Sequence, residues 1–418
     1  MILHRVQRAL RAFRSSPVIS EPRVAPRRAV AAVPPDPALE GCPADTILSL
    51  DRCPGCDHDE RTPLFRFNRF ALFGWQPDER AATYNYALCH GCGVVYATRR
   101  PAGQRYKWLM EHFEDTLGRM ESGGKIAITS RRLTDDERER LRQLAARGVY
   151  VSDHSGLKSN EFIPGLMRDR LANSPHVEMI GALMPVRNAR VLEIRSRLGS
   201  VGDALRRLFD ADVQVMTLFE NQQFLIQEVY GLPAASGIDF DHFQIPFDGV
   251  FDLIVANHML THAVRPAEFL ATVRQRLAPG GYLYVYNEFS EAEYLEKGKS
   301  MFSINPFHLQ VYNGPSLMRM LAGNGFTTTF LTTLRDAYVC VARRDDRSAA
   351  EPPRMTDKER AKRRSAYRKN LEASILVLPP GARWRIPNWD EMLQQALAAG
   401  TATVTKSGEV RLSQKRGR

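Results

Sequence analysis

The sequence contains few cysteines and lacks a long apolar segment. Only six of its 418 residues are cysteine, which is too few for a disulfide framework in a chain of this length. No segment approaches the ~18 uninterrupted apolar residues of a membrane-spanning helix. The amino-terminal segment also lacks the apolar core of a secretory signal. These features argue against a secreted or membrane-spanning protein, and they predict a cytoplasmic location.

Basic residues outnumber acidic ones at both ends of the chain. Residues 1–30 hold seven arginines and one acid, and the net charge of the whole chain is +11. Basic ends attract phosphate, nucleic acid or anionic lipid non-specifically, but solvated tails have the same composition. We therefore predict a basic, proline- and alanine-rich tail at 1–48 and a basic extension at 346–418, without assigning a function to either.

Four of the six cysteines form two pairs, Cys53-Pro-Gly-Cys56 and Cys89-His-Gly-Cys92. Each pair can turn tightly enough for two thiolates to occupy adjacent corners of a tetrahedron, and four thiolates make a closed structural zinc site. The pairs therefore predict a zinc ribbon over 49–100 in which these four residues bind the metal. Ordinary buried or redox cysteines are the alternative. The charged segment that follows predicts a helical connector over 101–164.

From residue 165 onward the pattern alternates between short apolar strands and amphipathic helices. Strands are expected near 190–194, 213–219, 251–256, 281–287 and 337–342. The clearest helix begins at Pro266 and ends before Pro279-Gly280-Gly281. This alternation predicts an α/β domain over 165–345, in which helices cover both faces of a mainly parallel sheet.

Several segments of this domain carry a recognisable pattern. An apolar strand from Val191 ends in an acid and a turn; the strand from Phe251 begins with Phe-Asp; Leu277-Ala-Pro-Gly-Gly precedes another strand. The pattern resembles class I S-adenosylmethionine-dependent methyltransferases. Together with the ribbon, it is similar to zinc-ribbon sugar C-methyltransferases. The resemblance implies a Rossmann-like fold, S-adenosylmethionine as cofactor, and a small polar acceptor such as a sugar or nucleotide sugar.

The resemblance also implies roles for individual residues. Glu193 would contact the methionine part of the cofactor, Glu220 its ribose, and the Asp239-Phe240 pair its adenine. Gly199 is the glycine that remains in the glycine-rich loop, and Asn257 ends the fourth strand beside the pocket. Arginines at 195 and 197 occupy the first two glycine positions of that loop. They would either fill the space of the methionine moiety or turn outward to contact a carboxylate or phosphate.

His262 is the candidate general base, because it follows the fourth strand near the expected acceptor position. Sugar C-methyltransferases place a Glu-His pair there, whereas this chain has Thr261 before the histidine. A histidine bonded to backbone at a helix start is an equally good interpretation of His262. His258 and His308 could line the same pocket or could be ordinary polar loop residues.

Two other functions remain open from the sequence. If the two arginines close the cofactor site, the chain would be a non-catalytic scaffold or binding protein. The sequence pI of about 9.5 and the ribbon would also suit an RNA or DNA methyltransferase. The fourth strand, however, lacks the Asn/Asp-Pro-Pro-aromatic motif that grips a flipped base. The sequence therefore favours the small acceptor and leaves its identity open.

Overall fold

The computed structural model describes residues 47–68, 83–110, 166–196, 198–297, 307–334, 337–346, 354–376, 389–400, 402–405 and 410–412, together with a few residues between 134 and 143. Most of the predicted tail and connector, Arg197 and Cys42 lie outside these ranges. Among the described helices, none is both long and apolar enough to cross a membrane.

A seven-stranded mixed sheet forms the centre of the molecule, with the strand order β12-β13-β10-β9-β6-β7-β8. The five strands from β10 to β8 are parallel, and β13 and β12 pair antiparallel at one edge. The strands are β6 (Arg190–Ile194), β7 (Asp212–Met216), β8 (Ala234–Ala235), β9 (Phe251–Asn257), β10 (Leu277–Phe289), β12 (Phe326–Leu334) and β13 (Ala337–Arg344). This sheet confirms the predicted α/β, Rossmann-like fold.

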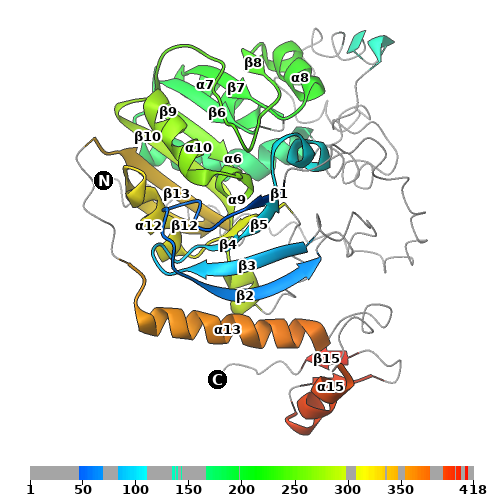
Figure 1. Cartoon of the computed structure of the whole chain (residues 1–418). Helices are drawn as coiled ribbons and strands as arrows, with labels where there is room; N and C mark the ends of the chain where they lie inside the picture. The colour runs from blue at the N-terminus through cyan, green and yellow to red at the C-terminus, as the bar shows by residue number, and fades with distance from the viewer. Residues whose placement is uncertain are drawn as a thin grey trace.

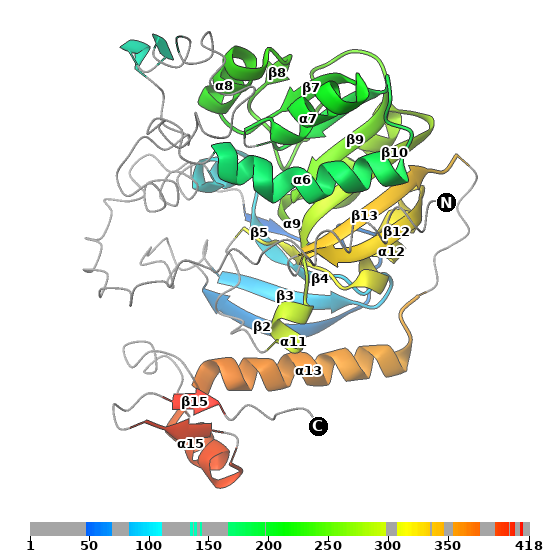
Figure 2. The same cartoon turned by 180° about the vertical axis from the view of Figure 1, so that it is seen from behind.

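Helices cover both faces of this sheet, because alternate strand residues point to opposite sides. Ile254 and Ala256 of β9 enter one core, whereas Leu253 and Val255 enter the other. The first core includes α10 (Pro266–Arg276) and α12 (Gly314–Gly323), which lie in front of the sheet in Figure 1. The second includes α6 (Leu166–Leu183), α7 (Ser200–Phe209) and α8 (Glu220–Tyr230). Of these, α6 and α7 face the viewer in Figure 2.

A second sheet contains the predicted ribbon and is completed by a segment of the larger domain. Its order is β11-β4-β3-β2, from β2 (Arg61–Asn68), β3 (Thr83–Cys89), β4 (Val95–Ala97) and β11 (Gln310–Val311). Nearby, β1 (Ile47–Ser49) pairs with β5 (Arg99–Pro101). The buried Arg100 donates to the carbonyl of Ala97 at 2.8 Å and to that of Val264 at 3.0 Å. The ribbon and the larger domain therefore share one core.

The carboxyl-terminal extension contains a helix that its sequence pattern does not predict, α13 (Asp357–Leu376). This helix lies along β2 (Figures 1 and 2). Its buried Arg363 forms an ion pair with Glu291, whose carboxylate also accepts a hydrogen bond from Tyr367 at 2.9 Å. Glu291 precedes the short α11 (Ala292–Leu295). Beyond α13 lie α15 (Trp389–Ala398) and the hairpin of β14 (Ala402–Val404) and β15 (Val410–Leu412).

Candidate functional site

The four predicted zinc ligands converge in the ribbon. The sulfur atoms of Cys53, Cys56, Cys89 and Cys92 all lie within 4.8 Å of one another. Two Sγ–Sγ distances are 3.7 Å, between Cys53 and Cys92, and 3.6 Å, between Cys56 and Cys89. Tetrahedral zinc with Zn–S bonds of ~2.3 Å separates its sulfurs by roughly 3.8 Å. The geometry of the cluster therefore fits a tetrathiolate zinc site.

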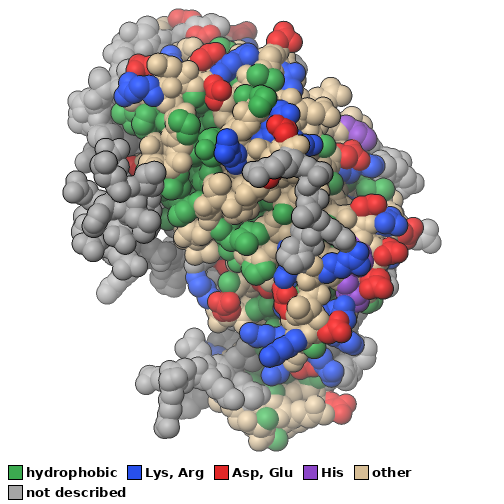
Figure 3. Space-filling view, turned by 90° about the vertical axis from the view of Figure 1, so that its left-hand side faces the viewer, with side chains coloured by type: hydrophobic (Ala, Val, Ile, Leu, Met, Phe, Trp, Pro, Cys, Tyr) green, Lys and Arg blue, Asp and Glu red, His purple; other side chains and the backbone are tan. Residues whose placement is uncertain are grey.

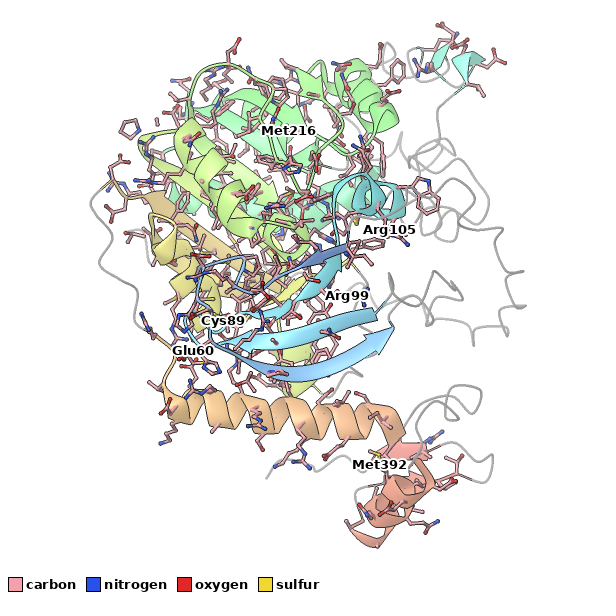
Figure 4. All side chains as sticks on the ribbon, viewed as in Figure 1. Glu60, Cys89, Arg99, Arg105, Met216 and Met392 are labelled. Carbon is pink, nitrogen blue, oxygen red and sulfur yellow. The ribbon has the colours of Figure 1, made fainter. Side chains whose placement is uncertain are left out.

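The thiols of this cluster do not share one protonation state. Hydrogen bonds from the Cys53 and Cys89 thiols lower the pKa of Cys56, and the contact with Cys53 lowers the pKa of Cys89. The neighbouring thiols thus favour the thiolate form at Cys56 and Cys89, whereas hydrogen bonds within the cluster and burial raise the pKa of Cys53 and Cys92. The cluster lies apart from the larger sheet: Figure 4 labels Cys89 among the ribbon strands and Met216, the last residue of β7, in the other sheet.

At the carboxyl edge of the parallel strands, the loop after β6 keeps the backbone shape of a tight turn. Gly199 has a φ of +72°, and a Cβ there would lie 3.1 Å from Ile226 and Tyr230 of α8. Glu193 is buried in β6, and its Oε2 accepts a hydrogen bond from the amide of Gly202 at 2.8 Å. That bond ties the strand to the first turn of α7, where a carboxylate is favoured by the helix dipole.

Glu220 does not lie at the end of a strand, which corrects the predicted strand over 213–219. The strand β7 ends at Met216, and Glu220 is the first residue of α8, where it is exposed. The residue that directly follows β7 is the buried Thr217, whose hydroxyl bonds to the side chain of Gln222. The predicted strand was too long because Leu218 and Phe219 are apolar, and apolar residues also occur just before helices.

The Asp239-Phe240 pair lies in a loop fixed by its own hydrogen bonds. Oδ1 of Asp239 accepts from the amides of Asp241 at 2.8 Å and His242 at 3.1 Å. The neighbouring Asp241 is buried and binds Nε of Arg265 at 2.8 Å and the amide of Gly103 at 2.8 Å. Phe240 is therefore held in a defined place at the edge of the site.

Arg195 turns into the site instead of outward. It is buried, with a φ of +60°, a left-handed conformation that glycine adopts without strain. Its guanidinium carbon lies 5.8 Å from the centre of the Phe240 ring. One guanidinium nitrogen is 3.4 Å from the carbonyl oxygen of His258. Asn257, the last residue of β9, contacts the Arg195 carbonyl at 3.4 Å and accepts from Asn287 at 2.9 Å.

Three histidines meet beside Arg195. His262 ends the short helix α9 (Met259–His262), His258 precedes that helix, and His308 comes from the segment before β11. The ring centres are 4.5 Å apart for His258 and His262, 4.9 Å for His258 and His308, and 5.2 Å for His262 and His308. We call these three residues the histidine cluster. Sequence spacing does not reveal it, because 46 residues separate His262 from His308.

His258 and His262 of the histidine cluster are uncharged near neutral pH. Burial lowers the pKa of His258 and His262 well below the usual range, and the positive charge of Arg195 lowers both further. His262 also shares a hydrogen bond with the backbone of Phe307, which opposes this shift. A neutral imidazole offers one nitrogen as an acceptor. The site therefore contains unprotonated imidazole nitrogens whose lone pairs can accept a hydrogen bond or bind a metal ion.

Glu288 is a buried residue that holds the backbone of α9 in place, and the sequence pattern does not reveal this role. Glu288 accepts hydrogen bonds from the amides of Leu260 and Thr261 at 2.9 and 2.8 Å, and from the Thr261 hydroxyl at 2.7 Å. Burial raises the pKa of Glu288 to about 7. Although Thr261 replaces a glutamate before His262, Glu288 thus places a carboxylate on the same turn. Glu288 lies where the register of β10 shifts, so the alternation of side chains along a regular strand does not predict which face it occupies.

Residues 160–330 match the family model described as a methyltransferase domain. This match confirms the expected methyltransferase domain within the chain, and it supports S-adenosylmethionine as the methyl donor. No protein of curated function has a detectable sequence match to the chain.

Several solved structures are similar to part of the chain. An S-adenosylmethionine-dependent methyltransferase from Mesorhizobium loti is 16% identical, with a TM-score of 0.35, over 41% of this chain and 98% of that chain. The 1,6-didemethyltoxoflavin N1-methyltransferase of Burkholderia thailandensis is 16% identical, with a TM-score of 0.35, over 52% and 92%. The magnesium protoporphyrin IX methyltransferase of Synechocystis is 14% identical, with a TM-score of 0.32, over 51% and 100%.

Proposed function

We propose that this protein transfers the methyl group of S-adenosylmethionine to a small polar acceptor such as a sugar or nucleotide sugar. One observation carries the proposal. The loops that follow β6 and β9 meet at the carboxyl edge of the parallel strands, within the residues that match a methyltransferase domain. Open α/β sheets bind their ligands at this edge. The donor and the acceptor would meet there, beside the histidine cluster.

In this proposal the cofactor lies along the loops described above. The backbone at Gly199 and the buried Glu193 would hold its methionine part, Glu220 its ribose, and the Asp239-Phe240 pair its adenine. Asn257 would contribute from the end of β9. The adenine assignment is supported by Phe240, because an aromatic side chain at the edge of the site can stack on a purine.

His262 is the proposed general base for the acceptor. Its neutral imidazole lies at the end of α9, and Nδ1 is buried without a hydrogen-bond partner among the described residues. Methyl transfer is an in-line displacement, so a base helps where the acceptor loses a proton and alignment supplies much of the remainder. Glu288 supports this role by fixing the turn that carries His262.

We also propose that the four cysteines bind zinc as a structural site. The support is the fit between the observed sulfur separations and those of a tetrathiolate ion. The closed donor set leaves no position for a substrate, so this ion would stabilise the ribbon instead of taking part in methyl transfer.

A small acceptor is preferred over nucleic acid for one further reason. On the face shown in Figure 3, acidic and basic side chains are interspersed. Nucleic-acid interfaces typically present a surface dominated by lysine and arginine. The face in Figure 3 therefore offers no support for an extended phosphate contact.

Calorimetric titration of the full-length protein with S-adenosylhomocysteine tests the proposal most directly. Micromolar binding to the wild-type protein is the expected result, because a product-like ligand should occupy a formed cofactor site. If a folded protein bound neither S-adenosylhomocysteine nor S-adenosylmethionine, the scaffold interpretation would replace this one.

A pair of substitutions on α8 tests the ribose assignment. Glu220→Ala should weaken S-adenosylhomocysteine binding by about tenfold, the equivalent of ~1.4 kcal/mol for a lost hydrogen-bonded carboxylate. Glu228→Ala removes an acid from the same helix two turns later and should leave binding unchanged. His262→Ala should affect cofactor binding less than Glu220→Ala does; equal losses would refute the ribose contact.

A further inference from the structure

We propose that the histidine cluster is a second metal site, which binds a divalent transition-metal ion such as Zn²⁺ or Fe²⁺ through three imidazoles. Metal binding can be tested without methyl transfer, but an ion on Nδ1 of His262 would occupy the lone pair that the proposed general base uses, so the two roles of His262 exclude each other. Only the role that we give the ion at the end of the argument rests on the proposed function.

The donor geometry is the first support. One ring nitrogen from each of His258, His262 and His308 lies within 4.8 Å of the others. Three imidazole nitrogens around a tetrahedral ion, with bonds of ~2.0–2.1 Å, are separated by roughly 3.4 Å. Side-chain rotations that draw the rings together by about 1 Å would close the site. Imidazole is a preferred donor for zinc, iron, copper and nickel.

Two possible donor atoms of the cluster lack a hydrogen-bond partner among the described residues. Nε2 of His258 and Nδ1 of His262 are buried, and within the described part of the chain neither has a hydrogen-bond partner. A buried polar atom without a partner is costly and calls for an explanation. Because Nδ1 is the unpartnered atom of His262, the hydrogen bond to the Phe307 backbone would use Nε2. A metal-binding histidine commonly donates its second nitrogen to a carbonyl in this way.

The backbone that carries the three rings is fixed from several sides. The Tyr106 hydroxyl donates to the His262 carbonyl at 2.9 Å, and the Tyr312 hydroxyl donates to the Leu260 carbonyl at 3.0 Å. The amide of Leu309 donates to the Thr261 carbonyl at 2.9 Å, which ties the segment of His308 to α9. Such support reduces the reorganisation that metal binding would require.

Arg195 is the feature that opposes a cation, since its guanidinium lies beside His258. Like charges at this range repel, so removal of the Arg195 charge should strengthen metal binding. A purely structural packing of three rings would show no such response. The arginine therefore provides a test that separates a metal site from a polar core.

Three protein ligands leave a coordination position free, as in catalytic rather than structural zinc sites. In the setting of the proposed function, that position would take an oxygen atom of the methyl acceptor and hold it near the carboxyl ends of β6 and β9. The chemical class of acceptor would then be a hydroxyl, enol or carboxylate compound.

Cobalt titration of the full-length protein tests the metal site without any assay of activity. The protein is first treated with a mild chelator that leaves the tetrathiolate zinc in place, and then receives Co²⁺ alone. We expect one equivalent to bind with visible ligand-field absorption but without the near-ultraviolet charge-transfer bands of thiolate ligation. Proton NMR of this form should show shifted, exchangeable imidazole N–H signals.

The variants and their control define the outcomes. His262→Ala and His308→Ala should each weaken Co²⁺ binding by at least tenfold, His176→Gln should leave it unchanged, and Arg195→Gln should tighten it. His176 is the matched control because it is buried but bonds to Tyr284 outside the cluster. Wild-type protein that takes up no Co²⁺, or that shows no shifted imidazole signals when loaded, overturns the proposal even if a histidine variant fails to fold. Cofactor binding is measured separately, so either proposal can fail alone.

Discussion

The cysteine cluster and the histidine cluster both gather possible metal ligands, but they differ in donor atoms and in their place in the fold. The cysteines belong to a small sheet and present four donors in a closed set. The histidines lie beside the core that the ribbon and the larger domain share, and they present three donors at the carboxyl edge of the main sheet. This difference indicates whether the metal ligands stabilise the fold or the fold positions the ligands. If the cysteines bind zinc as proposed, the small ribbon would depend on its donors to fold, whereas the packed domain would hold its donors in place.

The largest expected effect comes from breaking the cysteine cluster. Cys53→Ser should abolish zinc binding and destabilise the protein by about 4 kcal/mol or more, the range typical of a lost structural metal. Metal analysis by mass spectrometry and thermal unfolding measure the two effects. Cys340→Ser is the matched control, because Cys340 is buried in β13 away from the cluster. Stoichiometric zinc in Cys53→Ser would show that the ribbon does not need the tetrathiolate.

Removal of Glu288 should disturb the histidine cluster through its support. Glu288→Ala leaves the buried amides of Leu260 and Thr261 without their acceptor, at a cost of about 1–3 kcal/mol for each unsatisfied group. Urea unfolding measures the loss. Glu268→Ala, an exposed acid at the start of α10, should change stability by less than about 0.5 kcal/mol. Similar values for the two variants would mean that α9 is fixed without Glu288.

The pH dependence of stability should carry a contribution from Glu288. Its folded-state pKa of about 7 lies above its usual value of 4.5. The folded state therefore holds a proton that the unfolded state releases, and stability falls as pH rises from about 4.5 through 7. Between pH 5 and pH 8 the wild-type protein should lose about 2 kcal/mol more than Glu288→Gln. Parallel stability curves for the two proteins would contradict the raised pKa.

The same contrast explains how far the sequence could predict this molecule. Paired Cys-x-x-Cys motifs predict a metal site from local spacing, so the sequence alone identifies the four cysteines that the structure brings together. The same reason applies to the strands near 190 and 251 and to the helix after Pro266, because hydrophobic periodicity and the residues that begin or end an element can be recognised within a short stretch of sequence. The histidine cluster and Glu288 depend on which loops the sheet order brings together. The end of β7 was misplaced because apolar residues continue into the turn before α8.

The smallest expected effect concerns Arg195, whose side chain turns toward the histidine cluster from a glycine-like backbone position. Arg195→Gly should relieve left-handed strain worth about 1 kcal/mol and free the space beside Phe240. Calorimetry should then show tighter binding of S-adenosylhomocysteine. Arg195→Ala separates the two causes, because alanine removes the bulk but keeps the strain. If both variants bind S-adenosylhomocysteine more tightly to the same degree, the arginine side chain obstructs the site. If only Arg195→Gly raises the stability of the protein, the backbone at this position is strained. Weaker binding in both variants would show instead that the guanidinium holds the cofactor, as an inward-facing cation can hold a carboxylate.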